Sequence, residues 1–119
     1  MNLSVSKQVD LVIKGEVYDF AVANGIIARG EPLRYSRVLT LTKEQASEEL
    51  ERRGYPGIDH QVSQFRDVRD GLGWDEDSGS YRIYFYERGS DSDISFHDSE
   101  DEFRTAWKDI YIRMYFSHG

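Results

Sequence analysis

Apolar residues in the first part of the chain recur at the three- and four-residue spacing of an amphipathic helix. Between Ser6 and Asn24 this spacing predicts a first helix, with Ser6 as its N-cap and Asn24-Gly25 as its end. Gly15 lies inside this segment and lowers its helix propensity by about 1 kcal/mol relative to Ala. The stripe expected to face the core consists of Val9, Val12, Ile13, Val17, Phe20 and Ala21.

A second helix is marked by its terminal residues. Thr42 and Gln45 have the spacing of a capping box, in which each side chain satisfies an amide of the first turn. We expect this helix to run from Thr42 to Arg53 and to end at Gly54, with two arginines in the last turn, where the helix dipole favours cations.

Two other segments have weaker patterns. Residues 26–41 contain glycine, proline and β-branched residues, which predict a loop leading to a short strand at 35–39. Residues 59–72 carry apolar side chains at helical spacing before two glycines, which predict a third helix, with a strand as the alternative.

The pattern changes in the second half of the chain. Residues 81–87 and 91–97 read as two strands of a hairpin, joined by Arg88-Gly89-Ser90. Trp74 is expected to close an earlier strand, followed by a loop at 75–79. A last helix begins after Asp98 or Ser99, and its expected core stripe consists of Phe103, Ala106, Trp107, Ile110 and Met114.

The order of these elements predicts an α+β fold. Helices precede a run of strands, and one helix follows, which differs from the alternating pattern of a parallel α/β sheet. With 119 residues, the chain is expected to form one globular domain over 1–119, with N-terminal helices packed on a small antiparallel sheet and a C-terminal helix.

Acidic residues are concentrated in one segment. Between Asp75 and Glu102 there are ten carboxylates and two cations, so this segment carries a net charge of −8, whereas the whole chain carries −7. A field of one sign repels nucleic acid and attracts a basic protein. We therefore expect a basic protein as the partner, and neither a nucleic acid nor a membrane.

The expected elements divide this segment into three groups. Acids at 98–102 are explained by the positive end of the last helix dipole. Glu87 ends the strand at 81–87, and the remaining five lie in two loops at opposite ends of that strand, roughly 20 Å apart. We predict that these five carboxylates contact the partner, with three tyrosines as aromatic anchors; the eight residues are Asp75, Glu76, Asp77, Asp91, Asp93, Tyr81, Tyr84 and Tyr86.

Several other classes of function lack a supporting pattern. The chain has no cysteine, which excludes disulfides and thiolate chemistry, and it has neither a signal-peptide pattern nor an apolar run of membrane-spanning length. A cytoplasmic protein is expected. Asp75-x-Asp77 and Asp91-x-Asp93 begin like calcium loops but lack the glycine at the sixth position, and the three histidines are scattered, so we expect neither metal nor cofactor.

The C-terminal third carries a resemblance. Its strand ends in Glu87-Arg88-Gly89, the strand Ile94-Ser95-Phe96 follows, and the last helix opens Ser99-x-x-Glu102 and continues to Ala106-Trp107. This arrangement resembles small bacterial immunity proteins of polymorphic-toxin and contact-dependent growth inhibition systems. In some of those families the helix opens Ser-x-x-Glu-Ala, whereas here the alanine follows later, at Ala106.

The resemblance implies a cytoplasmic protein without catalytic residues that binds a cognate toxin domain and blocks it. A basic nuclease fits the charge, because carboxylates can occupy a groove that accepts phosphates. Two alternatives remain at this point: a DNA mimic or regulatory adaptor that occupies a basic nucleic-acid-binding protein, and a small hydrolase using paired carboxylates.

Overall fold

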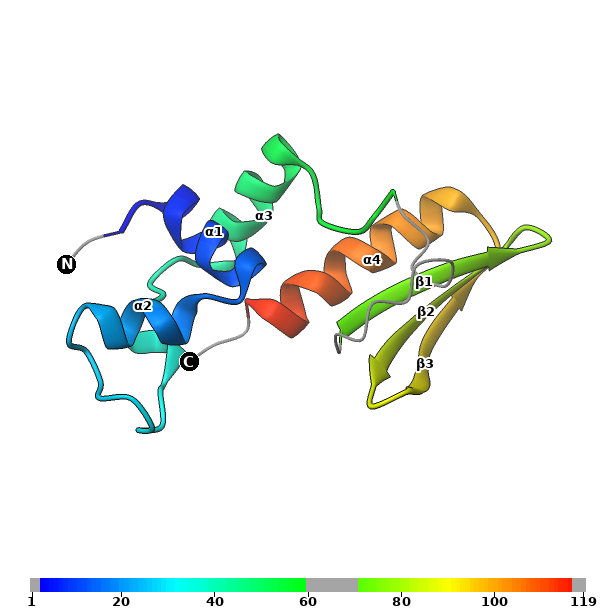
Figure 1. Cartoon of the computed structure of the whole chain (residues 1–119). Coiled ribbons are helices and arrows are strands. Elements are labelled where there is room, and N and C mark those ends of the chain that lie inside the picture. Colours follow the sequence, from blue (N-terminus) through cyan, green and yellow to red (C-terminus); the bar gives the residue numbers. More distant parts are fainter. Residues whose placement is uncertain (1–2, 60–70, 117–119) are drawn as a thin grey trace. The chain divides into compact units, whose positions relative to one another are not determined.

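The computed structural model describes residues 3–59 and 71–116. Its elements follow the order helices, strands, helix, and the sheet is antiparallel, which confirms the α+β class (Figure 1). The chain divides into two compact units, one formed by residues 1–54 and 112–119 and the other by residues 55–111. The last helix begins in the second unit, and its final residues belong to the first.

The first unit contains α1 (Val5–Lys14), α2 (Val17–Ala23), the 3-10 helix η1 (Tyr35–Arg37) and α3 (Lys43–Arg53). The prediction of a single helix over 6–24 is therefore wrong, because the first helix ends at Gly15. This glycine adopts a left-handed conformation, with φ of 68°, and the amide of Glu16 donates to the carbonyl of Leu11 across the break. This arrangement is a helix C-terminal motif, and it starts a new helix two residues later.

Three other predictions in this unit have mixed outcomes. The N-cap of α1 is Ser4 and not Ser6, since the Ser4 hydroxyl accepts from the amide of Lys7. The predicted strand at 35–39 is wrong, because residues 35–37 form η1. The predicted second helix is confirmed as α3, with both hydrogen bonds of the Thr42–Gln45 capping box in place.

Gln8 joins α1 to the segment before α3. Its buried side chain accepts from the amides of Thr40 and Leu41 at 2.7 and 3.0 Å, and it donates to the Thr40 hydroxyl and to the carbonyl of Leu3. A buried polar group is tolerated when its hydrogen bonds are made. The side-chain amide of Gln8 thus makes the hydrogen bonds to this loop that the backbone of a neighbouring strand would otherwise make.

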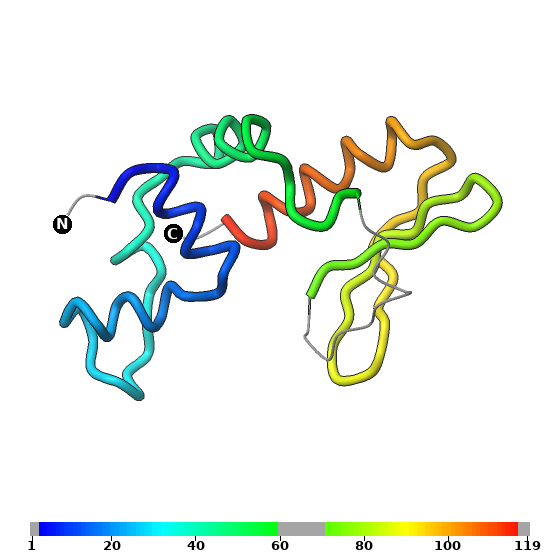
Figure 2. Tube along the Cα trace, turned by 45° about the horizontal axis from the view of Figure 1, so that its top comes forward, coloured from blue at the N-terminus to red at the C-terminus, as the bar shows by residue number. Residues whose placement is uncertain are grey.

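The second unit contains β1 (Gly71–Asp77), β2 (Ser80–Glu87), β3 (Ser90–His97) and most of α4 (Glu100–Tyr115). The strands run in the order β1-β2-β3, so β2 is central, and the Cα trace in Figure 2 follows this meander. The predicted hairpin of β2 and β3 is confirmed. Of the third helix predicted at 59–72, residues 60–70 lie outside the described residues, and its end is wrong because Gly71 and Leu72 belong to β1.

The predicted loop at 75–79 is also wrong, because Asp75, Glu76 and Asp77 are paired in β1 with residues of β2. The turn consists of only Ser78 and Gly79, both with positive φ. Such two-residue turns match the twist of a hairpin, and Arg88-Gly89 forms the second one. Three carboxylates assigned to a loop by their composition are thus strand residues with fixed directions.

Helix α4 begins as predicted, with the Ser99 hydroxyl accepting from the amide of Glu102. In this helix the Phe103 ring stacks on the Tyr81 ring with a centroid distance of 5.1 Å, and its centroid lies 4.5 Å from that of Trp74. Helix α4 therefore packs on the sheet face that bears Ile83. Trp107 and Ile110 are buried as predicted, whereas Met114 is 40% exposed and is not a core residue.

Candidate functional site

Residues that pair across an antiparallel sheet share a face, so the register assigns each side chain to one of two faces. We call the side that bears Arg82, Tyr84 and Tyr86 the Arg82 face, and the side that bears Tyr81, Ile83 and Phe85 the Ile83 face. The residues that pair with Arg82, Tyr84 and Tyr86 lie on the same face. They are Gly71, Gly73, Asp75, Asp91, Asp93 and Phe96.

Arg82 binds three carboxylates from the two neighbouring strands. Its Nε and Nη2 donate to the two oxygens of Asp75 at 3.1 and 2.6 Å, a bidentate geometry. On the other side, Nη1 donates to Asp93 at 2.9 Å and Nη2 lies 3.4 Å from Asp91. One guanidinium on the central strand therefore gathers an acid of β1 and two acids of β3.

The cluster contains more carboxylates than cations. Counted by themselves, its three carboxylates and one guanidinium carry a formal charge of −2 on one face of a three-stranded sheet. The hydrogen bonds that Arg82 donates to Asp75, and then to Asp93, raise the pKa of Arg82 above its ordinary value, so the cation is permanent. The Asp93 side chain is 50% exposed, so part of the negative charge faces solvent.

Tyr84 lies under the guanidinium. Its side chain is fully buried, and the Arg82 guanidinium carbon lies 4.4 Å from the ring centroid. Gly73 of β1 pairs with Tyr84, and a Cβ at this position would lie 2.9 Å from two ring carbons. The ring therefore uses the space that a larger residue at position 73 would fill, and it supports the arginine from below.

Two large apolar side chains lie beside the cluster. Phe96 pairs with Arg82 and is 61% exposed, and Ile94 is 42% exposed. The register shifts by one residue at Ile94, since Ile83 pairs with Ser95 while Tyr84 pairs with Asp93. Ile94 is therefore the extra residue of a bulge and follows Asp93 directly, while Phe96 lies on the Arg82 face. Apolar area and carboxylate charge thus occur side by side.

The structure redistributes the eight residues predicted to contact a partner. Asp75, Asp91 and Asp93 lie together around Arg82, so the prediction that these acids lie at opposite ends of a strand is wrong. The physical reason is that Asp75 sits within β1, beside Arg82, and the long arginine side chain reaches both acids of β3. Tyr86 is half-buried on the same face, whereas Tyr84 is fully buried and offers no surface to a partner.

The other three do not contact Arg82. Glu76 and Tyr81 belong to the Ile83 face, whereas Asp77 ends β1 on the Arg82 face, at the hairpin turn, where it accepts from the Ser78 hydroxyl. Sequence reasoning missed Arg82, Ile94 and Phe96 as site residues. The i, i+2 spacing of Arg82 and Tyr84 was the available signal for the arginine, because it places a cation on the face of a strand flanked by acids.

A pocket of about 290 Å³ opens on the other side of the sheet. Its floor and walls come from β1, β2, the start of α4 and the segment before residue 60; its lining residues are Ile58, Asp59, Trp74, Glu76, Tyr81, Glu100, Phe103 and Arg104. This pocket contains the two predicted partner-binding residues, Glu76 and Tyr81, that are absent from the Arg82 face.

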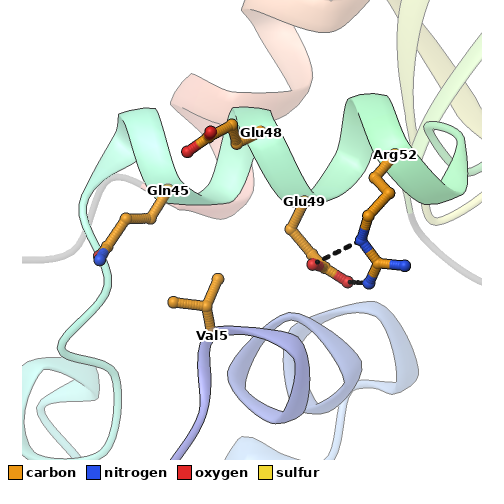
Figure 3. A pocket seen from close by; sticks show the side chains of 5 residues that line it. All are labelled: Val5, Gln45, Glu48, Glu49 and Arg52. Atoms are coloured by element: carbon orange, nitrogen blue, oxygen red, sulfur yellow. Dashed lines mark hydrogen bonds and ion pairs between the residues drawn. The ribbon is translucent and has the colours of Figure 1, made fainter.

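The first unit has a pocket of about 340 Å³ between α1 and α3, lined by Val5, Gln45, Glu48, Glu49 and Arg52 (Figure 3). Glu49 binds Arg52 at one end of it, at 2.5 Å, and also binds Arg53 at 2.7 Å. Arg53 also forms an ion pair with Asp10 of α1 and donates to the Ser6 hydroxyl of the same helix. These carboxylates therefore serve the packing of α1 on α3.

Across 3–59 and 71–116, no three histidine or acidic side chains are grouped so that they could hold a metal ion. Within the same ranges, no helix has both the length and the apolar character needed to cross a bilayer.

The chain was compared with models of known protein families, with curated proteins and with solved structures. No match was found in any of the three comparisons.

Proposed function

We propose that this chain is an immunity protein, which binds a basic toxin domain through the Arg82 face and blocks the toxin's access to its substrate. The negative charge of this chain favours a nuclease as the toxin. The observation that carries this proposal is the convergence of Asp75, Asp91 and Asp93 on Arg82, next to the exposed ring of Phe96. The resemblance of the C-terminal third to immunity proteins supports the same function.

The composition of the Arg82 face suits a protein–protein contact. Interfaces obtain most of their affinity from a few buried aromatic and arginine side chains, with charged groups around them. Phe96 and Ile94 would supply the apolar centre, and the carboxylates of the cluster would meet lysines and arginines of the partner. Opposite charges also raise the association rate, which benefits an inhibitor that must bind before the toxin acts.

Arg82 has a positioning role in this proposal. Its bidentate bond to Asp75 and its bond to Asp93 hold both carboxylates in one orientation before any partner binds. Rigid binding groups lose less conformational entropy on association. A nuclease groove accepts phosphates at fixed spacing, so carboxylates held in fixed positions are better substitutes for phosphates than mobile ones.

The test uses the toxin domain that the proposal expects a neighbouring gene to encode, at the C-terminus of a large secreted protein. We expect co-expression of this chain to restore growth of cells that express the toxin domain, and we expect the pair Asp91→Asn and Asp93→Asn to slow association at least tenfold at low salt. The matched control is Asp101→Asn with Glu102→Gln, which removes the same charge from the first turn of α4.

Two outcomes would refute this proposal. Growth inhibition that persists with the wild-type chain excludes an immunity function. Equal association rates for the two double variants exclude the Arg82 face as the contact, because long-range attraction by net charge alone would affect both equally. Circular dichroism and urea unfolding check that both variants are folded.

A further inference from the structure

We infer that the turn formed by residues 34–37, called the η1 turn below, is a second docking surface, which binds an acidic segment of a partner protein through Arg34, Tyr35 and Arg37. The η1 turn belongs to the first unit, whereas the Arg82 face belongs to the second. This inference goes beyond the proposed function, because an acidic ligand differs in kind from a basic toxin domain.

The segment around the η1 turn is opposite in charge to the chain as a whole. Residues 20–42 contain three arginines and a single acid, Glu31, so this stretch carries +2, whereas the whole chain carries −7. The carboxylate of Glu31 accepts from the amide of Ala28 and serves the loop before the turn. A cationic patch in an acidic chain selects a partner different from the one that the acids select.

Arg34 and Arg37 differ from the other arginines of the protein. Both are exposed, and within residues 3–59 and 71–116 neither side chain has a hydrogen bond, an ion pair or a ring contact. Each of the other arginines in these ranges has an interaction partner; they are Arg29, Arg52, Arg53, Arg82, Arg88, Arg104 and Arg113. The two guanidiniums of the η1 turn are therefore available to a ligand.

The backbone holds these two arginines one helical turn apart. The amide of Arg37 donates to the carbonyl of Arg34 at 3.0 Å, and the amides of Val38 and Leu39 both donate to the carbonyl of Tyr35. Val38 and Leu39 are buried and anchor the turn, whereas Tyr35 is 46% exposed. Because a 3-10 helix has three residues per turn, positions 34 and 37 fall on the same side of it. The surface is thus ordered before a ligand binds.

The chemistry of the η1 turn suits a short acidic segment of a protein. A planar guanidinium binds a carboxylate through two parallel hydrogen bonds, as Arg82 binds Asp75 in this chain. The exposed Tyr35 ring adds apolar contact area at a low entropic cost. A nucleic acid is disfavoured, because its affinity grows with the number of phosphates neutralised, and this turn supplies two cations in a chain of net charge −7.

The experiment uses acetyl-tetraglutamate amide as the probe and acetyl-tetraglutamine amide as its control, which has nearly the same shape without the charge. The readout is the NMR signals of the backbone amides of residues 34–37 in the full chain at low salt. We expect a saturable shift with tetraglutamate in the millimolar range, which decreases as salt is added, and no shift with tetraglutamine.

Variants then locate the site. Arg34→Gln with Arg37→Gln should weaken binding of tetraglutamate at least tenfold. The matched control is Lys7→Gln with Lys14→Gln, which removes the same charge from exposed positions of α1 and should leave binding nearly unchanged. Circular dichroism checks that both variants are folded.

Four results would overturn this inference. Two of them are equal shifts with both peptides and unchanged binding of tetraglutamate by the Arg34 and Arg37 variant. Tighter binding of a thymidine tetranucleotide than of tetraglutamate would assign the turn to a nucleic acid. Self-association of the wild-type chain that disappears in the Arg34 and Arg37 variant, measured by sedimentation, would assign it to a second copy of this chain.

Discussion

The guanidinium of Arg82 lies over the ring of Tyr84, 4.4 Å from the ring centroid, on the central strand of the sheet. The two residues are separated by one position, so both side chains point to the same face, and the arginine leans along the strand over the ring. This pair explains how one cation reaches acids on both neighbouring strands. Tyr84, which the sequence predicted as a partner-binding residue, is therefore part of the core.

Replacing Arg82 should destabilise the protein through the three carboxylates that remain. Arg82→Met keeps an apolar stem over Tyr84 but leaves Asp75, Asp91 and Asp93 without their shared cation. We expect a loss of about 1–3 kcal/mol in the free energy of unfolding, measured by urea denaturation at neutral pH and low salt.

Arg82→Lys serves as the control for this prediction. Lysine keeps the charge but not the planar guanidinium, so Arg82→Lys should lower the free energy of unfolding less than Arg82→Met does. Added salt should reduce the difference between the two variants. Equal stability of wild type and Arg82→Met at low salt would contradict the structural role of the cluster.

A methyl group at position 73 should disturb the support of Arg82. Gly73→Ala places a Cβ 2.9 Å from the Tyr84 ring, which is fully buried and cannot move into solvent. We expect a loss of about 1–3 kcal/mol from overpacking, measured by urea unfolding. In a double-mutant cycle with Tyr84→Leu, the cost of Gly73→Ala should fall; a cost independent of residue 84 would show that the ring is not the obstacle.

Arg53 should make the stability of the first unit depend on acid pH. Its hydrogen bonds lower the pKa of Asp10 below the ordinary value of 3.8 and that of Glu49 below 4.5. Both carboxyls bind protons more weakly when folded, so their contribution is fully present above the unfolded pKa values and is lost as pH falls through the folded ones. The midpoint of urea unfolding should therefore decrease as pH falls below about 4.5.

Arg53→Met should reduce this dependence, because Asp10 loses its hydrogen-bond donor and Glu49 keeps only its bonds from Arg52. The control is Arg29→Met, which breaks an exposed pair with Asp19 and should have little effect on stability. A steep decrease between about pH 5 and pH 3 that persists in Arg53→Met would assign the acid sensitivity to other groups.

Phe96 should matter for binding and not for folding. Because the ring is 61% exposed, Phe96→Ala should change the free energy of unfolding by less than about 0.5 kcal/mol. As the proposed apolar centre of the contact, the same change should weaken binding of the toxin domain at least tenfold, about 1.4 kcal/mol, as measured by calorimetry. Tyr35→Ala, which removes an exposed ring from η1, should leave affinity unchanged; equal effects of the two variants would exclude Phe96 as an anchor.

Local signals in the sequence predicted those parts of the fold that depend on neighbouring residues. The capping box of Thr42 and Gln45 located α3, and Arg88-Gly89 located the hairpin turn between β2 and β3. The same kind of reasoning failed at Gly15, where periodic apolar residues continue on both sides of a helix end. It also failed at residues 75–77, because acidic residues are typical of loops yet can be paired in a strand, where Asp75 binds the cation of Arg82.

By itself, the sequence determined the α+β class, the concentration of acids in one segment and the helix start that explains part of that charge. Only the tertiary structure decided which acids act together, because the register of three strands and the length of one arginine side chain bring Asp75 to Asp91 and Asp93. These residues are separated by up to 18 positions in the chain. Charge composition is a property of the chain, whereas a cluster of carboxylates beside an exposed phenylalanine is a property of one face of the folded sheet.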